Sequence, residues 1–187
     1  MTSGERLRLF VAVDVPTDHL ARVQELTAPL RAELGGARWT SESNQHITVK
    51  FLGSTPSERL AEVAEVCADV AARHASAEVH LNGLGAFPSL RRARVLWMGI
   101  DDPDGVLQRV AGALDRGFEA LGYAREPRVY TPHLTLARMK SPAPIRGPLP
   151  VMPTQLSPFS IDHLTLYRSR LSPRGAVYEV LERFALA

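Results

Sequence analysis

One short pattern, a histidine and a threonine separated by an apolar residue, occurs three times in the chain, at His46-Ile47-Thr48, His133-Leu134-Thr135 and His163-Leu164-Thr165. In each copy polar and apolar residues alternate with the period of a β-strand, so the imidazole and the hydroxyl project from the same face. At a rise of about 3.3 Å per residue the two groups lie roughly 6 to 7 Å apart. Both could therefore contact a single phosphate group.

Two such units facing each other would supply the groups that hydrolysis of a cyclic phosphodiester needs. One histidine takes a proton from the attacking water and the other gives a proton to the departing oxygen, roles that imidazole can fill near neutral pH. The threonine hydroxyls can donate hydrogen bonds to the non-bridging phosphoryl oxygens, where negative charge develops. This chemistry requires no metal ion and no other cofactor.

Two other interpretations of the motif are open. Each histidine and threonine could be an ordinary half-exposed strand residue with local hydrogen bonds, which is the better interpretation for one isolated copy. A metal-dependent nuclease would need carboxylate ligands for magnesium or manganese, and paired carboxylates do not accompany the histidines. Asp162, beside His163, is the one nearby exception.

The elements that would position these motifs are those of an α+β fold. Helical periodicity covers 18–34, with Pro29 inside it as a possible kink or end. Another helix is predicted to begin after Pro103 and to stop at Gly122, with its inward face formed by Leu107, Val110, Leu114, Phe118 and Leu121. A further helix is predicted to begin with Thr55 as its N-cap and Pro56 as its first residue, and to bury Leu60, Val63, Cys67 and Val70. The proline-rich segment 141–158 is predicted to be a surface connection. Strand-like runs occupy 7–13, 46–52, 78–84, 93–100, 133–139, 159–168 and 176–184.

Composition places the chain among globular proteins with a single folding unit. Of 187 residues 45% are hydrophobic and 22% charged, with a net charge of only +2, which argues against disorder and only hints at an anionic partner. The lone Cys67 has no partner for an intramolecular disulfide, as expected in a reducing compartment. No signal peptide pattern and no apolar run of membrane-spanning length is present, so we expect a cytoplasmic protein with no membrane contact.

The residues around the first two motifs resemble a known family. The segments RLFVAVDVP, HITVKFLG, LGAFPSLRRARVLW and TPHLTLAR are similar to those of the 2H phosphoesterases, specifically the bacterial and archaeal RNA 2′,3′-cyclic phosphodiesterases of the 2′-5′ RNA ligase family. This resemblance implies a bilobal, pseudo-twofold α+β fold, in which residues 1–187 form one domain of two intimately packed lobes. Each lobe would carry an antiparallel sheet with helices and would contribute one motif to a central catalytic cleft.

The same resemblance implies site residues and a reaction. His46 and Thr48 match the first family signature, and His133 and Thr135 match the second. The reaction would open a terminal 2′,3′-cyclic phosphate on RNA, tRNA fragments included, to a 2′-phosphate, with a monomeric enzyme. We assign His133 as the proton acceptor that activates water and His46 as the proton donor. The third copy, His163 and Thr165, lacks the family context and is expected to be structural or to lie at the substrate's edge.

Seven further residues are candidates for substrate binding, each with a structural alternative. Arg91, Arg92 and Arg94 concentrate positive charge at a loop-to-strand edge and would bind RNA phosphates, or form a solvated loop. Lys50 should share the face of His46 and Thr48, as a ligand contact or as an exposed edge lysine. Arg138 is expected to contact substrate or to brace its strand, and it needs a bulge to reach the face of His133. Phe51 and Tyr130 are expected either to stack on a base or to belong to the core.

Three functions are compatible with these patterns. Hydrolysis of the cyclic phosphate comes first. Ligation is the same chemistry in reverse, with a ribose hydroxyl as the attacking group, and water at about 55 M opposes it by mass action. A catalytically inactive module that binds RNA ends is the third, and it would show salt-dependent affinity without turnover.

Overall fold

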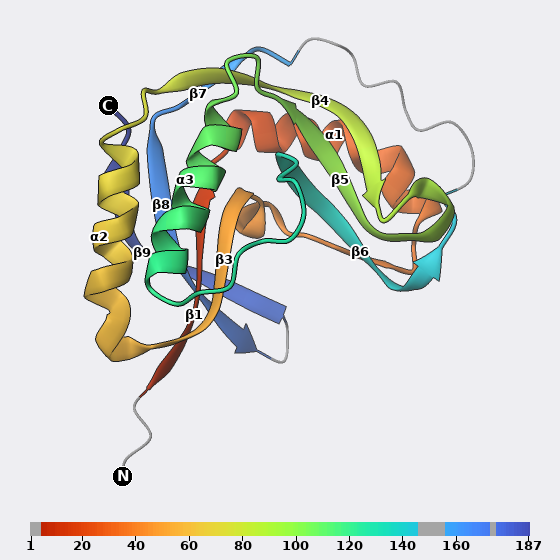
Figure 1. The fold of residues 1–187 in the computed structure, drawn as a ribbon. Coiled ribbons are helices and arrows are strands. Elements are labelled where there is room, and N and C mark those ends of the chain that lie inside the picture. Colours follow the sequence, from red (N-terminus) through yellow and green to blue (C-terminus); the bar gives the residue numbers. More distant parts are fainter. Residues whose placement is uncertain (1–4, 146–155, 173–174) are drawn as a thin grey trace.

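The computed structural model describes residues 5–145, 156–172 and 175–187, and it has the α+β architecture that the sequence predicts. Three helices accompany nine strands within these ranges (Figure 1). The helices are α1 (Thr17–Glu33), α2 (Leu60–Ala71) and α3 (Val106–Ala120). The strands are β1 (Arg6–Val13), β2 (Ala37–Trp39), β3 (Ile47–Pro56), β4 (Ala77–Phe87), β5 (Ala93–Asp101), β6 (His133–Ala143), β7 (Phe159–Ile161), β8 (His163–Ser172) and β9 (Gly175–Ala185).

The strands form one antiparallel sheet in the order β7-β4-β5-β6-β3-β1-β8-β9, with β2 paired to β6. Its two halves, β7-β4-β5-β6 and β3-β1-β8-β9, join where β6 meets β3. That junction consists of a single residue pair, Ile47 with Leu134. The adjacent strand pairs, β5 with β6, β3 with β1 and β1 with β8, are each joined by four to eight residue pairs. The two halves can therefore diverge on either side of the junction.

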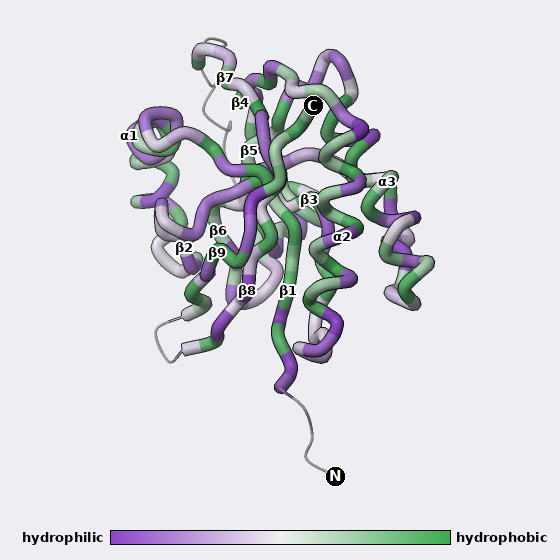
Figure 2. Tube along the Cα trace, turned by 90° about the vertical axis from the view of Figure 1, so that its left-hand side faces the viewer, coloured by the Kyte–Doolittle hydropathy of each residue, from purple (hydrophilic) through white to green (hydrophobic). Residues whose placement is uncertain are grey.

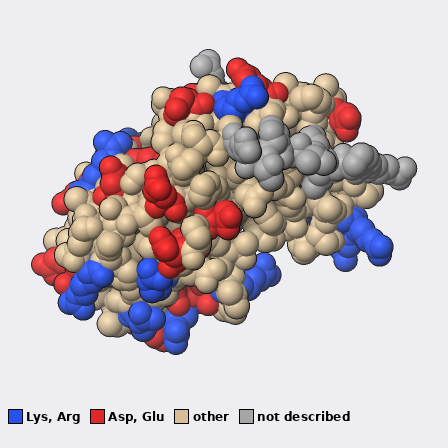
Figure 3. Space-filling model, turned by 90° about the horizontal axis from the view of Figure 1, so that it is seen from above, with Lys and Arg blue, Asp and Glu red and all other residues tan. Residues whose placement is uncertain are grey.

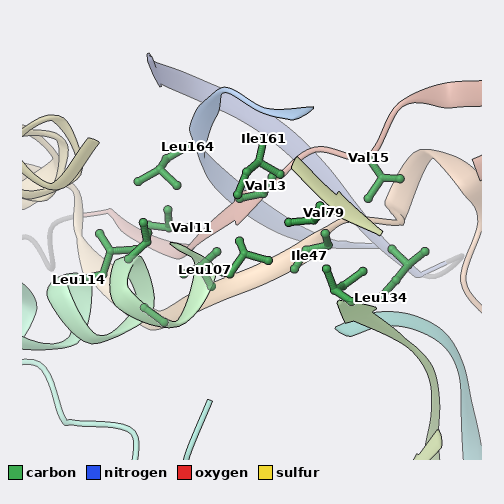
Figure 4. Packing of buried hydrophobic residues seen from close by; sticks show 14 of the residues in the cluster. Val11, Val13, Val15, Ile47, Val79, Leu107, Leu114, Leu134, Ile161 and Leu164 are labelled. Atoms are coloured by element: carbon green, nitrogen blue, oxygen red, sulfur yellow. The ribbon is translucent and has the colours of Figure 1, made fainter. Parts of the chain in front are cut away.

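Helices cover the sheet from two sides. Figure 2 shows α1 on one side of the strands and α2 and α3 on the other, and the β1 tube is hydrophobic along most of its length. The apolar side chains of β1 and β3 that face α3 are fully buried, with Val11 and Ile47 at 0% exposure (Figure 4). Burial of each such side chain contributes about 1.5 to 3 kcal/mol, so this packing fixes which face of β3 is left for a site.

Helix α3 follows its sequence pattern closely. Of the residues predicted to face inward, Leu107, Val110, Leu114 and Phe118 are 0 to 1% exposed, and Leu121 is partly buried. The carboxylate of Asp102 accepts hydrogen bonds from the backbone N–H groups of Val106 and Leu107, and Gly122, at φ 84°, follows the last turn. Side-chain capping before the helix and a left-handed glycine after it set both limits.

The predicted cap of the second helix is wrong. Thr55 is fully buried within β3 and its hydroxyl accepts a hydrogen bond from Tyr123, while residues Ser57–Arg59 form a 3-10 turn before α2 begins at Leu60. The strand continues because Thr55 pairs with Leu7 of β1, which outweighs the local capping preference. Val63, Cys67 and Val70 are buried as predicted.

Pro29, a possible kink or end of the first helix, lies inside α1 without ending it. Two other boundaries differ from expectation. The run 159–168 is divided between β7 and β8 at Asp162. The first residues of the predicted proline-rich connection belong to β6, which extends to Ala143 and pairs there with Ala93 of β5. The centre of that connection, 146–155, lies outside the described residues.

Charges of both signs are interspersed on the described part of the face seen in Figure 3, in keeping with the small net charge. None of the helices in the described ranges is long and apolar enough to cross a membrane. Any recognition of an anion must therefore come from individual residues of a site.

Candidate active site

The single pair that joins the two half-sheets also brings the first two motifs together. Ile47 and Leu134 are the middle residues of those motifs, are fully buried, and pair antiparallel between β3 and β6. Antiparallel register then sets His46 opposite Thr135 and Thr48 opposite His133, all on the face away from the core. Each imidazole thus lies across from the hydroxyl of the other motif.

All four motif residues line one pocket of about 280 Å³. Arg8 and Arg138 add positive charge to its wall, and Phe51 adds an aromatic ring that is 65% exposed. No described residue forms a hydrogen bond with the hydroxyl of Thr48 or Thr135. The remaining lining residues are Leu9, Phe10, Thr40, Asn44, Gly53, Ser169, Leu171, Ala176 and Tyr178.

His46 lies just before β3 among aromatic rings. It stacks on Phe10, with ring centroids 4.8 Å apart, and Tyr178 meets it edge-on at 5.1 Å. Burial among these rings lowers the pKa of His46 from 6.5 to about 4, although the charge of Asp14 and a backbone hydrogen bond with Asn44 oppose the shift.

His133 begins β6 and has an equivalent backbone partner. Its Nδ1–H donates to the carbonyl oxygen of Thr131 at 2.7 Å, two residues earlier, as Asn44 is two residues before His46. A carbonyl can only accept, so a neutral His133 ring carries its lone pair on Nε2. Burial lowers the pKa of this histidine also, and Phe87 packs edge-on against it at 5.0 Å.

A β-bulge follows the threonine in each motif strand. Thr48 and Lys50 pair with consecutive residues of β1, which leaves Val49 as the extra residue. Thr135 and Ala137 likewise pair with consecutive residues of β5, which leaves Leu136 as the extra residue. Each bulge reverses the alternation beyond it.

The bulges decide which of the candidate binding residues reach the pocket. Phe51 and Arg138, each five residues after a motif histidine, line the pocket despite their odd spacing. The bulge that Arg138 needs is present. The expectation that Lys50 shares the face of His46 and Thr48 is wrong, because the bulge at Val49 turns its side chain to the other side of β3.

Lys50 and Tyr130 serve the opposite face of β3 instead. The Lys50 ammonium is 6% exposed, forms an ion pair with Asp115 of α3 and donates to the carbonyl of Ala124 at 2.9 Å. The Tyr130 hydroxyl donates to the carbonyl of Thr48 at 3.0 Å, and its ring packs against the core. Both residues tie the segment that leads into β6 to the first motif strand.

The three arginines of the loop-to-strand edge lie outside the pocket lining. Arg91 and Arg92 are in a 3-10 turn (Leu90–Arg92), Arg94 is in β5, and all three are exposed. Their guanidinium groups form no hydrogen bond or ion pair with the described residues, although the backbone N–H of Arg92 donates to the carbonyl of Ser89. The turn follows Phe87, which contacts His133, so these arginines are attached to one side of the site without entering it.

The third copy of the motif does not share the pocket. His163 Nε2 and the Thr165 hydroxyl both approach Oδ2 of Asp14, at 3.0 and 3.1 Å, and Thr165 is fully buried. His163 also forms an ion pair with Asp162 through Nδ1. These contacts favour the structural role, one of the two roles expected for the third copy.

Several lining residues were not predicted from the sequence. Arg8 and Phe10 alternate along β1 with buried leucines, a strand pattern that would have identified their shared face. Asn44 and Tyr178 come from segments with no chemical signature, and only the pairing of β9 with β8 brings Tyr178 to His46. Among the residues that the structure describes, no group of three or more His, Cys, Asp or Glu has a metal-binding arrangement.

Comparison with known proteins gives consistent results. A family model described as the 2′-5′ RNA ligase superfamily matches residues 15–172. A protein of Methanothermobacter thermautotrophicus named RNA 2′,3′-cyclic phosphodiesterase is 31% identical, over 97% of this chain and all of its own. A Thermus thermophilus protein of the same name is 35% identical, over 96% of this chain and 90% of its own.

Solved structures share the architecture over nearly the full length. A Thermus thermophilus protein of known structure superimposes with a TM-score of 0.79 at 31% identity, covering 96% of this chain and 98% of its own. Escherichia coli LigT complexed with 3′-AMP gives a TM-score of 0.79 at 26% identity, covering 98% and 99%. The family model, the relatives and the paired histidine motifs agree, and the chain belongs to the 2′-5′ RNA ligase superfamily.

Proposed function

We propose that the protein is an RNA 2′,3′-cyclic phosphodiesterase, which hydrolyses a terminal 2′,3′-cyclic phosphate on RNA to a 2′-phosphate. The observation that carries this proposal is the pocket in which two imidazoles and two hydroxyls converge from the two motif segments. Within the described residues, neither hydroxyl is occupied by a hydrogen bond to the protein. Relatives named RNA 2′,3′-cyclic phosphodiesterase, aligned over nearly the whole chain, support it.

The mechanism uses one imidazole for each proton. The neutral Nε2 of His133 accepts a proton from water as the water oxygen attacks phosphorus. The bond from phosphorus to the ribose 3′ oxygen breaks, and protonated His46 gives its proton to that oxygen. Thr48 and Thr135 donate hydrogen bonds to the two non-bridging oxygens, which bear the developing charge. One water is consumed, and one proton has passed from His46 to the product and one from water to His133.

Other lining residues hold the substrate. Arg138 and Arg8 bring positive charge to the anion, and the exposed ring of Phe51 offers a surface for a base to stack on. A bound phosphate anion also raises the pKa of both histidines, which favours the protonated form of His46 that the mechanism requires. Arg91, Arg92 and Arg94 lie outside the pocket and would contact only a longer RNA.

A second hollow continues from the pocket and fits the preceding nucleotide. It has a volume of about 490 Å³ and shares six lining residues with the pocket, Arg138 and Tyr178 among them. Arg38 and Trp39 of β2 line its far part. A guanidinium and an indole there suit a phosphate and a base. We expect the monomer to be the active form.

Replacing Arg38 with alanine should therefore affect long substrates only. For a dinucleotide that ends in a 2′,3′-cyclic phosphate we expect KM to rise about three- to tenfold, because one charge-assisted contact is lost. For a cyclic mononucleotide kcat/KM should stay the same. Arg22→Ala, which removes an exposed arginine of α1, is the control. Equal effects on both substrates would rule out this subsite.

The reaction itself is tested with oligoribonucleotides that end in a 2′,3′-cyclic phosphate, in the presence of EDTA. We expect a 2′-phosphate as the product, at a rate that EDTA does not change. A 3′-phosphate would reverse the proposed bond cleavage. Loss of activity that magnesium or manganese restores would contradict the metal-free mechanism.

The two alternatives give different results in the same assay. Ligation would appear as a longer RNA when an oligonucleotide with a free 5′-hydroxyl is added, and we expect it to be minor beside hydrolysis. A binding module would retain the cyclic phosphate unchanged. Candidate cellular substrates are RNAs with such ends, tRNA fragments among them.

A further inference from the structure

A fully hydrogen-bonded carboxylate lies next to the first motif. Asp14, which follows β1, accepts hydrogen bonds at Oδ2 from His163 and Thr165 of β8, at 3.0 and 3.1 Å. Its Oδ1 accepts from the hydroxyl of Tyr167, and Arg183 of β9 is 3.5 Å from Oδ2. Four donors from two strands therefore fix the position of one carboxylate.

Strand register directs this carboxylate toward His46. Val13 of β1 pairs with Ile47 of β3, so the next antiparallel positions, Asp14 and His46, are opposite each other. The side chains are also linked through aromatic rings. Tyr167, which donates to Asp14, stacks on Phe10 at 5.1 Å and 11°, and Phe10 stacks on His46.

The other motif histidine has no such neighbour. Around His133 lie the rings of Phe87 and Trp97 and the carbonyl of Thr131, and the charge that acts on it is that of Arg138. No described carboxylate acts on it. Asp14 is therefore a carboxylate that acts on one motif histidine and not on the other.

Building on the proposed function, we propose that Asp14 is a positioning residue whose negative charge favours the protonated form of His46, and that it thereby supports His46 as the acid and His133 as the base. The third His-x-Thr copy then has a purpose. His163 and Thr165, with Tyr167, hold Asp14 in place, although they touch no substrate themselves.

The charges around His46 are consistent with this role. Asp14 raises the pKa of His46, whereas burial, Arg138 and His133 lower it. Asp14 in turn remains ionised, because the hydrogen bonds from Tyr167, His163 and Thr165 outweigh its burial and lower its pKa. Burial alone would lower the pKa of His163, but its contacts with Asp14 and Asp162 raise it. The titratable and charged groups that face His46 are Asp14 after β1, Arg8 of β1, His133 and Arg138 of β6, Tyr167 of β8 and Tyr178 of β9.

The test is Asp14→Asn, which keeps the size of the side chain and removes its charge. We expect the pKa of His46, followed by NMR of its ring, to fall by about half a unit to one unit. If His46 is the acid, kcat/KM at pH 8, above the pKa of both histidines, should fall by the same factor, about three- to tenfold. The pH optimum, the mean of the two pKa values, should move down as well.

Two further variants make the result specific. Asp162→Asn removes the other carboxylate that contacts His163, one that the register does not direct at His46, and should leave the pKa of His46 unchanged. Tyr167→Phe keeps the stacked ring and removes one hydrogen bond to Asp14. It tests the hydrogen bonds that hold Asp14 if Asp14→Asn folds poorly. We expect it to lower kcat/KM at pH 8, but by less than Asp14→Asn does.

Each outcome has a distinct meaning. An unchanged pKa of His46 in Asp14→Asn would overturn the proposal. A lower pKa with unchanged kcat/KM at pH 8 would make His46 the base and overturn the assignment, because a base that is already deprotonated loses nothing. Failure of the proposed function has a different signature. In that case the pKa of His46 would still fall in Asp14→Asn, but the wild-type protein would not open the cyclic phosphate.

Discussion

His46→Gln and His133→Gln are each expected to lower kcat by about 10²- to 10⁴-fold on a substrate with a terminal 2′,3′-cyclic phosphate. Glutamine retains a polar side chain of similar reach but can neither take up nor release a proton near pH 7. The loss should appear in kcat with little change in KM, since the substrate's phosphate still meets Arg138 and the two threonines. Initial rates measured over a range of substrate concentrations, from below KM to saturation, give both constants.

The matched control is His80→Gln. His80 lies on β4, is partly exposed and does not line the pocket. It should retain full activity. The double variant of His46 and His133 should be little worse than the weaker single variant, because the two groups act in one step. A single variant that keeps more than a tenth of the wild-type kcat would contradict the two-histidine mechanism.

Thr48→Val and Thr135→Val are expected to lower kcat by about 10²-fold each, the scale observed when one donor to a developing oxyanion is removed. Valine has nearly the shape of threonine and favours strands, so β3 and β6 should be undisturbed. Because each threonine lies across from the histidine of the other motif, each loss weakens charge stabilisation beside a proton transfer. Thermal unfolding should confirm that both variants fold as the wild type does.

Thr27→Val distinguishes loss of a catalytic donor from loss of any buried hydroxyl. The Thr27 hydroxyl donates to the carbonyl of Val23 inside α1, away from the pocket, and the residue is 1% exposed. This variant should keep its kcat, with at most about 1 kcal/mol lost from the free energy of unfolding. If the motif variants behaved like Thr27→Val, the threonines would have no part in the reaction.

Much of the site follows from the sequence because local alternation decides it. His46 and Thr48 project to one side of β3 and Ile47 to the other, which is what a strand period of two requires. Helix α3 was predictable for a similar reason, since its apolar period and its terminal residues agree. In both places local pattern and tertiary packing favour the same structure.

What could not be predicted depends on contacts between strands. An extra residue at Val49 and another at Leu136 reverse the faces of Lys50 and Arg138, and a bulge arises from pairing with a neighbouring strand that the local sequence does not specify. Thr55 was misread as a helix cap for the same reason. Capping is a local preference, and the pairing of Thr55 with β1 overrode it.

The third motif shows most clearly what the sequence could not predict. His163 and Thr165 match the pattern as well as the other two copies, and sequence alone offered only the family context to set them apart. Their role depends on Asp14, nearly 150 residues earlier, with which His163 and Thr165 form hydrogen bonds. A residue recruited over that distance leaves no trace in the spacing of the motif itself.

The contact of Ile47 with Leu134 has a consequence for how such a protein can change. The gap between the imidazoles is set by main-chain atoms at one crossing point, so surface loops can lengthen and outer strands can vary while a phosphate still fits. A change of one methyl group at that crossing would be felt by both rings at once. The same geometry therefore lets loops and outer strands accept sequence changes and makes the Ile47–Leu134 pair sensitive to them.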